Sequence, residues 1–180
     1  MNTTTSPTAG NDKPKPAITD LSFKIKTSKA TIRDLSGSCI CGASRYKVNG
    51  PPSRSVICHC HNCQKWSGGP FAAQIYIPRV FFNLDEAYSA HIRSYTDTQH
   101  DGVEAIERHF CGKCGSNLYV DVQYLDIIMI TRGTVDSPLE NFRVLDPEVE
   151  YCCSQRVSWA EISSTRDKRQ GLYGEQESSS

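Results

Sequence analysis

The sequence predicts a mainly β protein built from several small antiparallel sheets, with little helix. Two observations lead to this class. Short apolar runs, several alternating with polar residues at the period of two typical of a half-buried strand, are separated by Gly, Pro, Asn and Asp. No window of twelve residues carries the apolar stripe of an amphipathic helix.

Each strand-like run is short, and its apolar residues mark the face that we expect to be buried. In chain order the runs are Leu21/Phe23/Ile25, Tyr46/Val48, Ile75/Ile77, Ile92 with Tyr95, Leu118/Val120/Val122, Ile127–Ile130 and the alternating run Val149–Val157. Short turns or single-turn helices are expected around Asn62–Trp66 and Ser137–Phe142.

Length and composition indicate one domain. The chain has 180 residues, 38% hydrophobic and 22% charged, with 20 Lys and Arg against 20 Asp and Glu. A net charge of zero does not favour a nucleic-acid binder, which needs clustered positive charge. With no long apolar run and no signal-peptide pattern, a soluble cytoplasmic protein without a membrane partner is expected. The expected parts are a disordered tail at 1–28, a domain at 29–162 and a polar tail at 163–180.

The cysteines are the most informative residues. There are nine, an odd number that does not suit a disulfide framework in a chain without a secretory signal. They are grouped one to three residues apart, which is poor spacing for disulfides between neighbours but good spacing for ligands of one metal ion. The groups are Cys39-Ile-Cys41, Cys58-His-Cys60-His-Asn-Cys63, Cys111-Gly-Lys-Cys114 and Cys152-Cys153.

Two of these groups predict a structural zinc site. Cys111 and Cys114 form a zinc-knuckle turn, in which the following glycine permits a tight backbone, and Cys39 with Cys41 is a shorter half-site of the same kind. Two half-sites far apart in sequence supply the four thiolates of a closed tetrahedral zinc site. The alternative is that these are reduced cysteines of the core.

The group Cys58, Cys60 and Cys63 predicts a second zinc site of a different kind. Three protein ligands with an open fourth position are typical of catalytic zinc. A small-molecule thiol would complete the tetrahedron and would be deprotonated by the metal. The alternative is a closed structural site, in which His59, His61 or a distant residue fills the fourth position.

The residues around this group have weaker signals. His59 and His61 alternate with the ligands, so a supporting or surface role is favoured over ligation, with proton shuttling as a further option. Cys152 and Cys153 are assigned as small hydrophobic residues and not as ligands. The segment 64–71 is expected to form a compact loop that offers backbone N–H groups to a carboxylate or carbonyl, with Lys65 attracting an anion. Packing in the core is expected for Trp66 and Phe71.

Together these motifs resemble the glutathione-dependent formaldehyde-activating enzyme family, which includes the centromere protein V domain. The resemblance extends from about Leu35 to Ile162. Its residues are Gly37-Ser-Cys39-Ile-Cys41-Gly42, Arg45-Tyr46, Cys58-His-Cys60-His-Asn-Cys63, Gly69-Pro70-Phe71, Phe110-Cys111-Gly-Lys-Cys114-Gly115-Ser116, Gly133-Thr134-Val135-Asp136 and Trp159.

The resemblance implies an all-β fold with two zinc ions. It implies a structural site of Cys39, Cys41, Cys111 and Cys114, and a catalytic site of Cys58, Cys60 and Cys63. It also implies a carbon–sulfur lyase that joins or cleaves glutathione, as co-substrate, and an aldehyde, as in S-(hydroxymethyl)glutathione.

This sequence departs from the family pattern at three places. It has Gln64-Lys65 in place of a basic pair, Glu150 near a common His, and 163–168 in place of the usual ending. Two alternative functions stay open beside the enzyme: a non-catalytic zinc scaffold that binds protein or chromatin, and a zinc buffer or redox sensor. The sequence does not indicate the oligomeric state.

Overall fold

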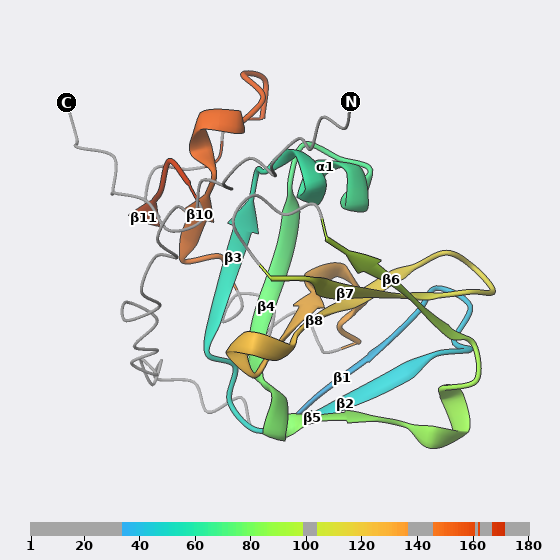
Figure 1. Ribbon diagram of the computed structural model, residues 1–180. Helices are drawn as coiled ribbons and strands as arrows, with labels where there is room; N and C mark the ends of the chain where they lie inside the picture. The colour runs from blue at the N-terminus through green and yellow to red at the C-terminus, as the bar shows by residue number, and fades with distance from the viewer. Residues whose placement is uncertain (1–33, 99–103, 137–145, 161, 163–166, 172–180) are drawn as a thin grey trace, which may run out of the picture.

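The strands of the described residues form two β-sheets, shown in Figure 1 for the computed structural model. The structure describes residues 34–98, 104–136, 146–160, 162 and 167–171. The strands are β1 (Asp34–Ser38), β2 (Arg45–Asn49), β3 (Arg54–Cys58), β4 (Ala72–Pro78), β5 (Phe82–Leu84), β6 (Ile92–Asp97), β7 (Ile106–Cys111), β8 (Asn117–Val122), β9 (Ile127–Thr131), β10 (Val149–Tyr151) and β11 (Asp167–Lys168). The mainly β class is therefore confirmed.

Helix is scarce among the described residues, as the sequence predicts. The α-helix is α1 (His61–Ser67), and the 3₁₀ turns are η2 (Arg79–Phe81), η3 (Glu86–Tyr88), η4 (Gln123–Leu125), η5 (Arg132–Thr134) and η6 (Cys153–Gln155). The short helix expected around Asn62–Trp66 is thus α1. The run Leu21/Phe23/Ile25 and the turn at Ser137–Phe142 lie outside the described residues.

The smaller sheet has the order β1-β2-β5, and the larger has the order β11-β10-β3-β4-β9-β8-β7-β6. All the strand pairs are antiparallel except at one edge, where β10 runs parallel to both β3 and β11. This parallel edge differs from the purely antiparallel sheets that we expected. Residues 167–171, expected to belong to a polar tail, supply β11 and its flanking hydrogen bonds to that edge.

Alternation along the strands builds a core on each face of the larger sheet. Ile75 and Ile77 of β4 point into a cluster with Tyr46 and Val48 of the smaller sheet, so this sheet covers one face. Tyr76, between them in sequence, joins a cluster on the opposite face. The apolar residues expected to be buried in β2, β4, β8 and β9 are buried, except Met129 of β9, which is partly buried. In β6 the expectation is wrong, because Ile92 is only partly buried and Tyr95 is exposed.

Candidate metal centres and active site

The first group of cysteines joins the two sheets. Cys39 and Cys41 follow β1, while Cys111 ends β7 and Cys114 lies in the turn to β8. The four sulfur atoms lie within 4.8 Å of one another, with Cys41 Sγ 3.5 Å from Cys39 Sγ and 3.9 Å from Cys111 Sγ. Four Zn–S bonds of about 2.3 Å in a tetrahedron place sulfur atoms about 3.8 Å apart. The donor set therefore fits one zinc ion.

Local backbone geometry shapes both halves of this site. Gly42 and Gly115, which follow the second cysteine of each half, have φ angles of 71° and 77°, in the region that glycine adopts without strain. The Gly42 N–H donates to Cys39 O and the Gly115 N–H to Cys111 O, closing two similar turns. Hydrogen bonds from Ser116 lower the pKa of the exposed Cys114 thiol to about 5, which favours the thiolate.

The second group of cysteines lies where β3 passes into α1. Cys58 is the last residue of β3, Cys60 is the N-cap of α1, and Cys63 is in its first turn. The Cys60 sulfur accepts the Cys63 N–H at 3.4 Å, as an N-cap side chain does. The three sulfur atoms lie within 4.8 Å of one another, and all three residues are buried. We call them the three-thiol group.

The neighbouring thiols shift the pKa values of Cys60 and Cys58 in opposite directions. The neighbouring thiols of Cys152, Cys58 and Cys63 lower the pKa of Cys60. The thiols of Cys152, Cys60 and Cys63, together with burial, raise the pKa of Cys58. Three sulfur atoms this close to one another suit a group that binds a cation.

His59 lies between two members of the three-thiol group and is held by Glu150. Both residues are completely buried, and His59 Nε2 is 3.2 Å from Glu150 Oε2. Arg156 Nη1 lies 3.6 Å from the same carboxylate oxygen. Glu150 comes from β10, whose parallel pairing places it opposite Ile57, one residue before Cys58. His59 is thus buried and paired with Glu150, while His61 is exposed.

The structure at Cys152 differs from the strand that the sequence predicts. We expected a strand through Val149–Val157 with Cys152 as an ordinary core residue, but β10 ends at Tyr151. Cys152 then takes a left-handed conformation, with φ 58° and ψ 43°, and η6 follows. Cys152 is buried in the same cluster as Cys58, Cys60 and Cys63, and its thiol shifts the pKa of Cys58 upward and that of Cys60 downward. The parallel pairing of β10 and β3 accounts for this position, because it sets Tyr151 beside Cys58.

The loop after α1 also differs from expectation. Gly68 ends the helix with a φ angle of 67°, and its N–H donates to Gln64 O at 2.9 Å. The Gly69 N–H donates to Ser67 Oγ at 3.2 Å. Both N–H groups are used within the chain to close the helix, so they are not available to a carboxylate or carbonyl of a ligand.

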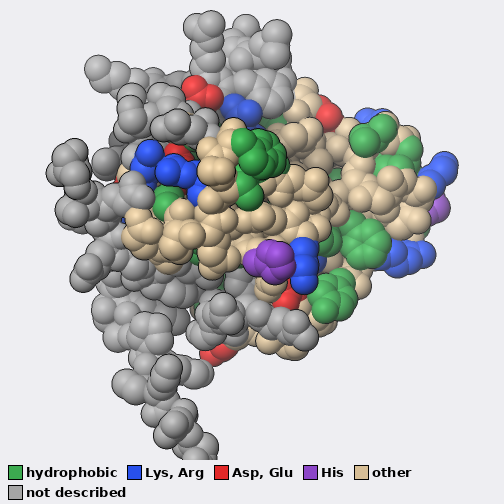
Figure 2. Space-filling model, turned by 90° about the horizontal axis from the view of Figure 1, so that it is seen from above, with side chains coloured by type: hydrophobic (Ala, Val, Ile, Leu, Met, Phe, Trp, Pro, Cys, Tyr) green, Lys and Arg blue, Asp and Glu red, His purple; other side chains and the backbone are tan. Residues whose placement is uncertain are grey.

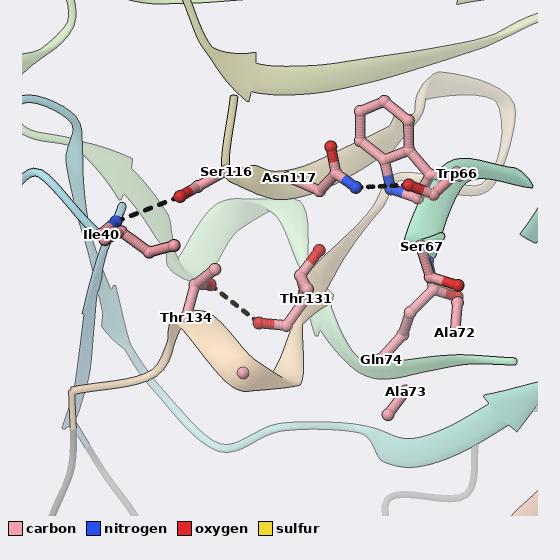
Figure 3. Close-up of a pocket in the computed structure, with 11 residues that line it drawn as sticks. Ile40, Trp66, Ser67, Ala72, Ala73, Gln74, Ser116, Asn117, Thr131 and Thr134 are labelled. Carbon is pink, nitrogen blue, oxygen red and sulfur yellow. Dashed lines mark hydrogen bonds between the residues drawn. The ribbon is translucent and has the colours of Figure 1, made fainter. Parts of the chain in front are cut away.

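A cavity of about 250 Å³ lies between the loop of the first cysteine group and the end of α1. In Figure 3, Ile40 and Ser116 line one side of it, Trp66 and Ser67 line the other, and Thr131 and Thr134 lie between them. Its side chains are uncharged, and several carry hydroxyl or amide groups. The full lining is Ile40, Trp66, Ser67, Ala72, Ala73, Gln74, Ser116, Asn117, Thr131, Gly133 and Thr134.

Trp66 connects the cavity to a buried positive charge. Its carbonyl accepts a hydrogen bond from the Asn117 amide, and its ring lies under the Arg108 guanidinium, whose carbon is 5.3 Å from the ring centroid. Arg108 is 3% exposed and bonds Asp97 through Nε at 2.9 Å. The thiol of Cys58 lowers the pKa of Cys63 and the charge of Arg108 adds a smaller lowering effect, but Cys60 and burial raise this pKa overall. Sequence spacing had no signal for Arg108, because β7 brings it to this place.

Comparison with known proteins agrees with this geometry. The family model of the glutathione-dependent formaldehyde-activating enzyme matches residues 34–155. A Halomonas elongata protein named "Putative glutathione-dependent formaldehyde-activating enzyme" is 31% identical over 141 residues, covering 75% of this chain and 85% of that protein. This chain belongs to the glutathione-dependent formaldehyde-activating enzyme family.

Both cysteine groups and the cavity-lining Gly133 and Thr134 lie within the residues that the family model matches. Among solved structures, a crystal structure of a Rhodobacter sphaeroides protein has a TM-score of 0.46 at 13% identity, covering 59% of this chain and 94% of that one. In the described part of the chain, no helix has the length and apolar character needed to cross a membrane.

Proposed function

We propose that this protein is a zinc-dependent carbon–sulfur lyase-type enzyme that acts on glutathione–aldehyde adducts, such as S-(hydroxymethyl)glutathione, or on related thiol conjugates. The observation that carries the proposal is the three-thiol group. Three buried sulfur atoms within 4.8 Å of one another, in a family named for glutathione and formaldehyde, are suited to a metal that also takes a substrate thiol.

The two cysteine groups have different roles in this proposal. Cys39, Cys41, Cys111 and Cys114 would hold a structural zinc, because four thiolates fill the tetrahedron. The group of Cys58, Cys60 and Cys63 would hold a catalytic zinc. When bound there, zinc would supply the positive charge that keeps a coordinating thiol deprotonated at neutral pH.

In this proposal the residues around the three-thiol group also have roles. The hydroxyl and amide groups of the cavity suit the peptide groups of glutathione, and the cavity reaches Ala72, whose Cα pairs with that of Cys58. His59 is completely buried with Nε2 3.2 Å from Glu150 Oε2, and its backbone N–H donates to Tyr151 O, so it lies fixed between Cys58 and Cys60. We assign it a positioning role.

The proposed reaction is balanced without an oxidant or reductant. In the synthetic direction a bond forms between the glutathione sulfur and the aldehyde carbon, and the thiol proton ends on the aldehyde oxygen. In the lyase direction the same bond breaks, and the hydroxyl proton returns to sulfur. The protein accelerates a reversible addition, so its effect is a rate of exchange and not a position of equilibrium.

The test measures that exchange directly. Two-dimensional exchange NMR with ¹³C-formaldehyde and glutathione gives the rate at which the adduct forms and breaks, and native mass spectrometry counts bound zinc. Wild-type protein should bind two zinc ions and accelerate exchange. Cys60→Ser should bind one and return exchange to the uncatalysed rate. The matched control, Cys153→Ala, should change neither, since the Cys153 thiol donates to Glu150 O at 3.7 Å, away from the three sulfurs.

Two outcomes would overturn the proposal. Full exchange by a folded Cys60→Ser variant would remove the three-thiol group from the chemistry. Two zinc ions that are indifferent to millimolar glutathione, with no acceleration for any aldehyde or conjugate tested, would favour the scaffold function. The face shown in Figure 2 does not support a scaffold that binds chromatin, because its basic side chains lie in separate places.

A further inference from the structure

Cys152 is a thiol that the proposed function leaves without a role. It follows β10 directly, is 3% exposed, and shares one buried cluster with the three-thiol group. The parallel pairing of β10 and β3 sets the residue before it, Tyr151, opposite Cys58. Cys152 is 89 residues beyond Cys63 in the sequence, so the fold and not a local motif brings it here.

The backbone at Cys152 is unusual. A φ angle of 58° with a side chain costs about 1–2 kcal/mol relative to the right-handed region, and glycine is the residue that avoids this cost. The conformation ends the strand, so Cys152 and Cys153 do not face opposite sides as they would in an extended chain. Non-glycine residues held in this region often mark functional sites, and here the residue is a buried thiol beside candidate metal ligands.

We propose that Cys152 is the fourth thiolate ligand of the second metal site and closes that site when no substrate thiol is bound. Cys58, Cys60 and Cys63 supply three vertices of the tetrahedron. Cys152 shares a buried cluster with all three and directly follows Tyr151, whose Cα pairs with that of Cys58, while its sulfur lies outside the set of three that are within 4.8 Å of one another. A four-thiolate zinc site would bring the sulfur atoms to about 3.8 Å from one another. A rotation of its side chain, without movement of β10, is expected to bring the sulfur onto the fourth vertex.

The consequence for turnover rests on the proposed function. An incoming thiol would take the place of Cys152 and give its proton to the departing Cys152 thiolate. One metal–sulfur bond forms as one breaks, and the number of thiolates and the net charge of the site are unchanged. Cys152 would therefore protect the resting site from other ligands, while a thiol substrate opens it at little energetic cost.

The test replaces the sulfur and keeps the backbone. Cys152→Gly suits a φ angle of 58°, so it should fold at least as well as the wild type. Cys152→Ser is a second variant that keeps a polar side chain of similar size. Cys153→Ala is the matched control, because it removes the neighbouring buried sulfur.

The readout is coordination and not activity. The full chain is loaded with ¹¹³Cd, which gives one NMR resonance per site, and replacement of a thiolate by oxygen moves that resonance upfield. In the wild type both resonances should fall in the four-thiolate range. Cys152→Gly should move one of them upfield and weaken that site by more than about tenfold in competition with a chelator, since even outer-shell partners contribute 10–100-fold. Cys153→Ala should do neither.

The inference is overturned if Cys152→Gly moves neither resonance, if one wild-type resonance already lies in the three-thiolate range, or if metal-loaded wild type carries a disulfide from Cys152 to Cys58 or Cys60. Its failure is separate from that of the proposed function. Accelerated formaldehyde exchange with an unmoved spectrum would reject the role of Cys152 alone. Four thiolates at both sites without any exchange would keep the ligand and reject the enzyme.

Discussion

Replacing Glu150 by alanine should destabilise the protein by about 3–5 kcal/mol, because the change removes one partner of a buried charged pair. The carboxylate is completely buried, 3.2 Å from His59 Nε2 and 3.6 Å from Arg156 Nη1. Its removal leaves the buried imidazole of His59 without its hydrogen-bond partner and the guanidinium of Arg156, whose side chain is 24% exposed, without the nearby negative charge.

The substitution Glu150→Gln removes the charge of the side chain and keeps its shape. A unit charge pair at 3.6 Å, the distance from Glu150 to Arg156, is worth about 4.6 kcal/mol at an effective dielectric constant of 20. Burial of the carboxylate offsets several kcal/mol of this, and an amide oxygen still accepts from His59. We therefore expect Glu150→Gln to cost about 1–3 kcal/mol, less than alanine.

Thermal and urea unfolding of metal-loaded protein measure these differences. For a chain of this length, 1 kcal/mol shifts Tm by about 2–4 °C, so Glu150→Ala should lower Tm by roughly 6–20 °C. The matched control is Glu148→Ala, an exposed glutamate two residues earlier, which should stay within about 0.5 kcal/mol of the wild type. If Glu150→Ala were as mild as this control, the buried pair would not support the second site as we describe.

Three further predictions test other parts of the structure. Gly37→Ala should cost about 3 kcal/mol in urea unfolding, because its Cβ would lie 2.1 Å from the Tyr46 ring, whereas Gly133→Ala, with open space around it, should be mild. Arg108→Lys should cost about 1–3 kcal/mol by the same measurement. Lysine cannot keep both the forked contact with Asp97 and the stacking on Trp66. An unchanged midpoint of urea unfolding would contradict this. Treatment with a strong chelator should lower Tm and broaden the amide NMR spectrum. One equivalent of zinc should then restore most of the fold. Full stability without metal would contradict a structural zinc.

The strands and the first cysteine group could be predicted because their signals are local. Tyr46 and Val48 alternate with polar residues in five consecutive positions, and burial follows that alternation. The glycine after Cys41 and the glycine after Cys114 indicate tight turns, and both adopt positive φ angles. These features depend on a few adjacent residues, so they can be read without knowing the fold.

The surroundings of the three-thiol group could not be predicted in this way. Glu150 and Cys152 come to Cys58 through a parallel strand pair, and a parallel register carries no local turn signal that would reveal it. The alternating pattern suggested a long strand, but a left-handed residue at Cys152 ends it after three residues. The sequence offered only one signal for this arrangement. It contains a three-cysteine motif that lacks a fourth ligand, and a separate pair of cysteines far along the chain.

The two cysteine groups lie in different parts of the molecule. The first joins the end of β1 to the turn between β7 and β8, so a metal bound there would link the smaller sheet to the larger one (Figure 1). The second lies at the end of β3, where β10 is held by three paired residues and by the hydrogen bond from His59 N to Tyr151 O at 3.0 Å. Loss of the first metal should therefore weaken the whole fold, because it separates the sheets. Loss of the second should loosen only the parallel edge, and this edge carries Glu150 and Cys152. A site that exchanges a ligand during turnover is better placed at such an edge, since its opening leaves the core between the sheets intact.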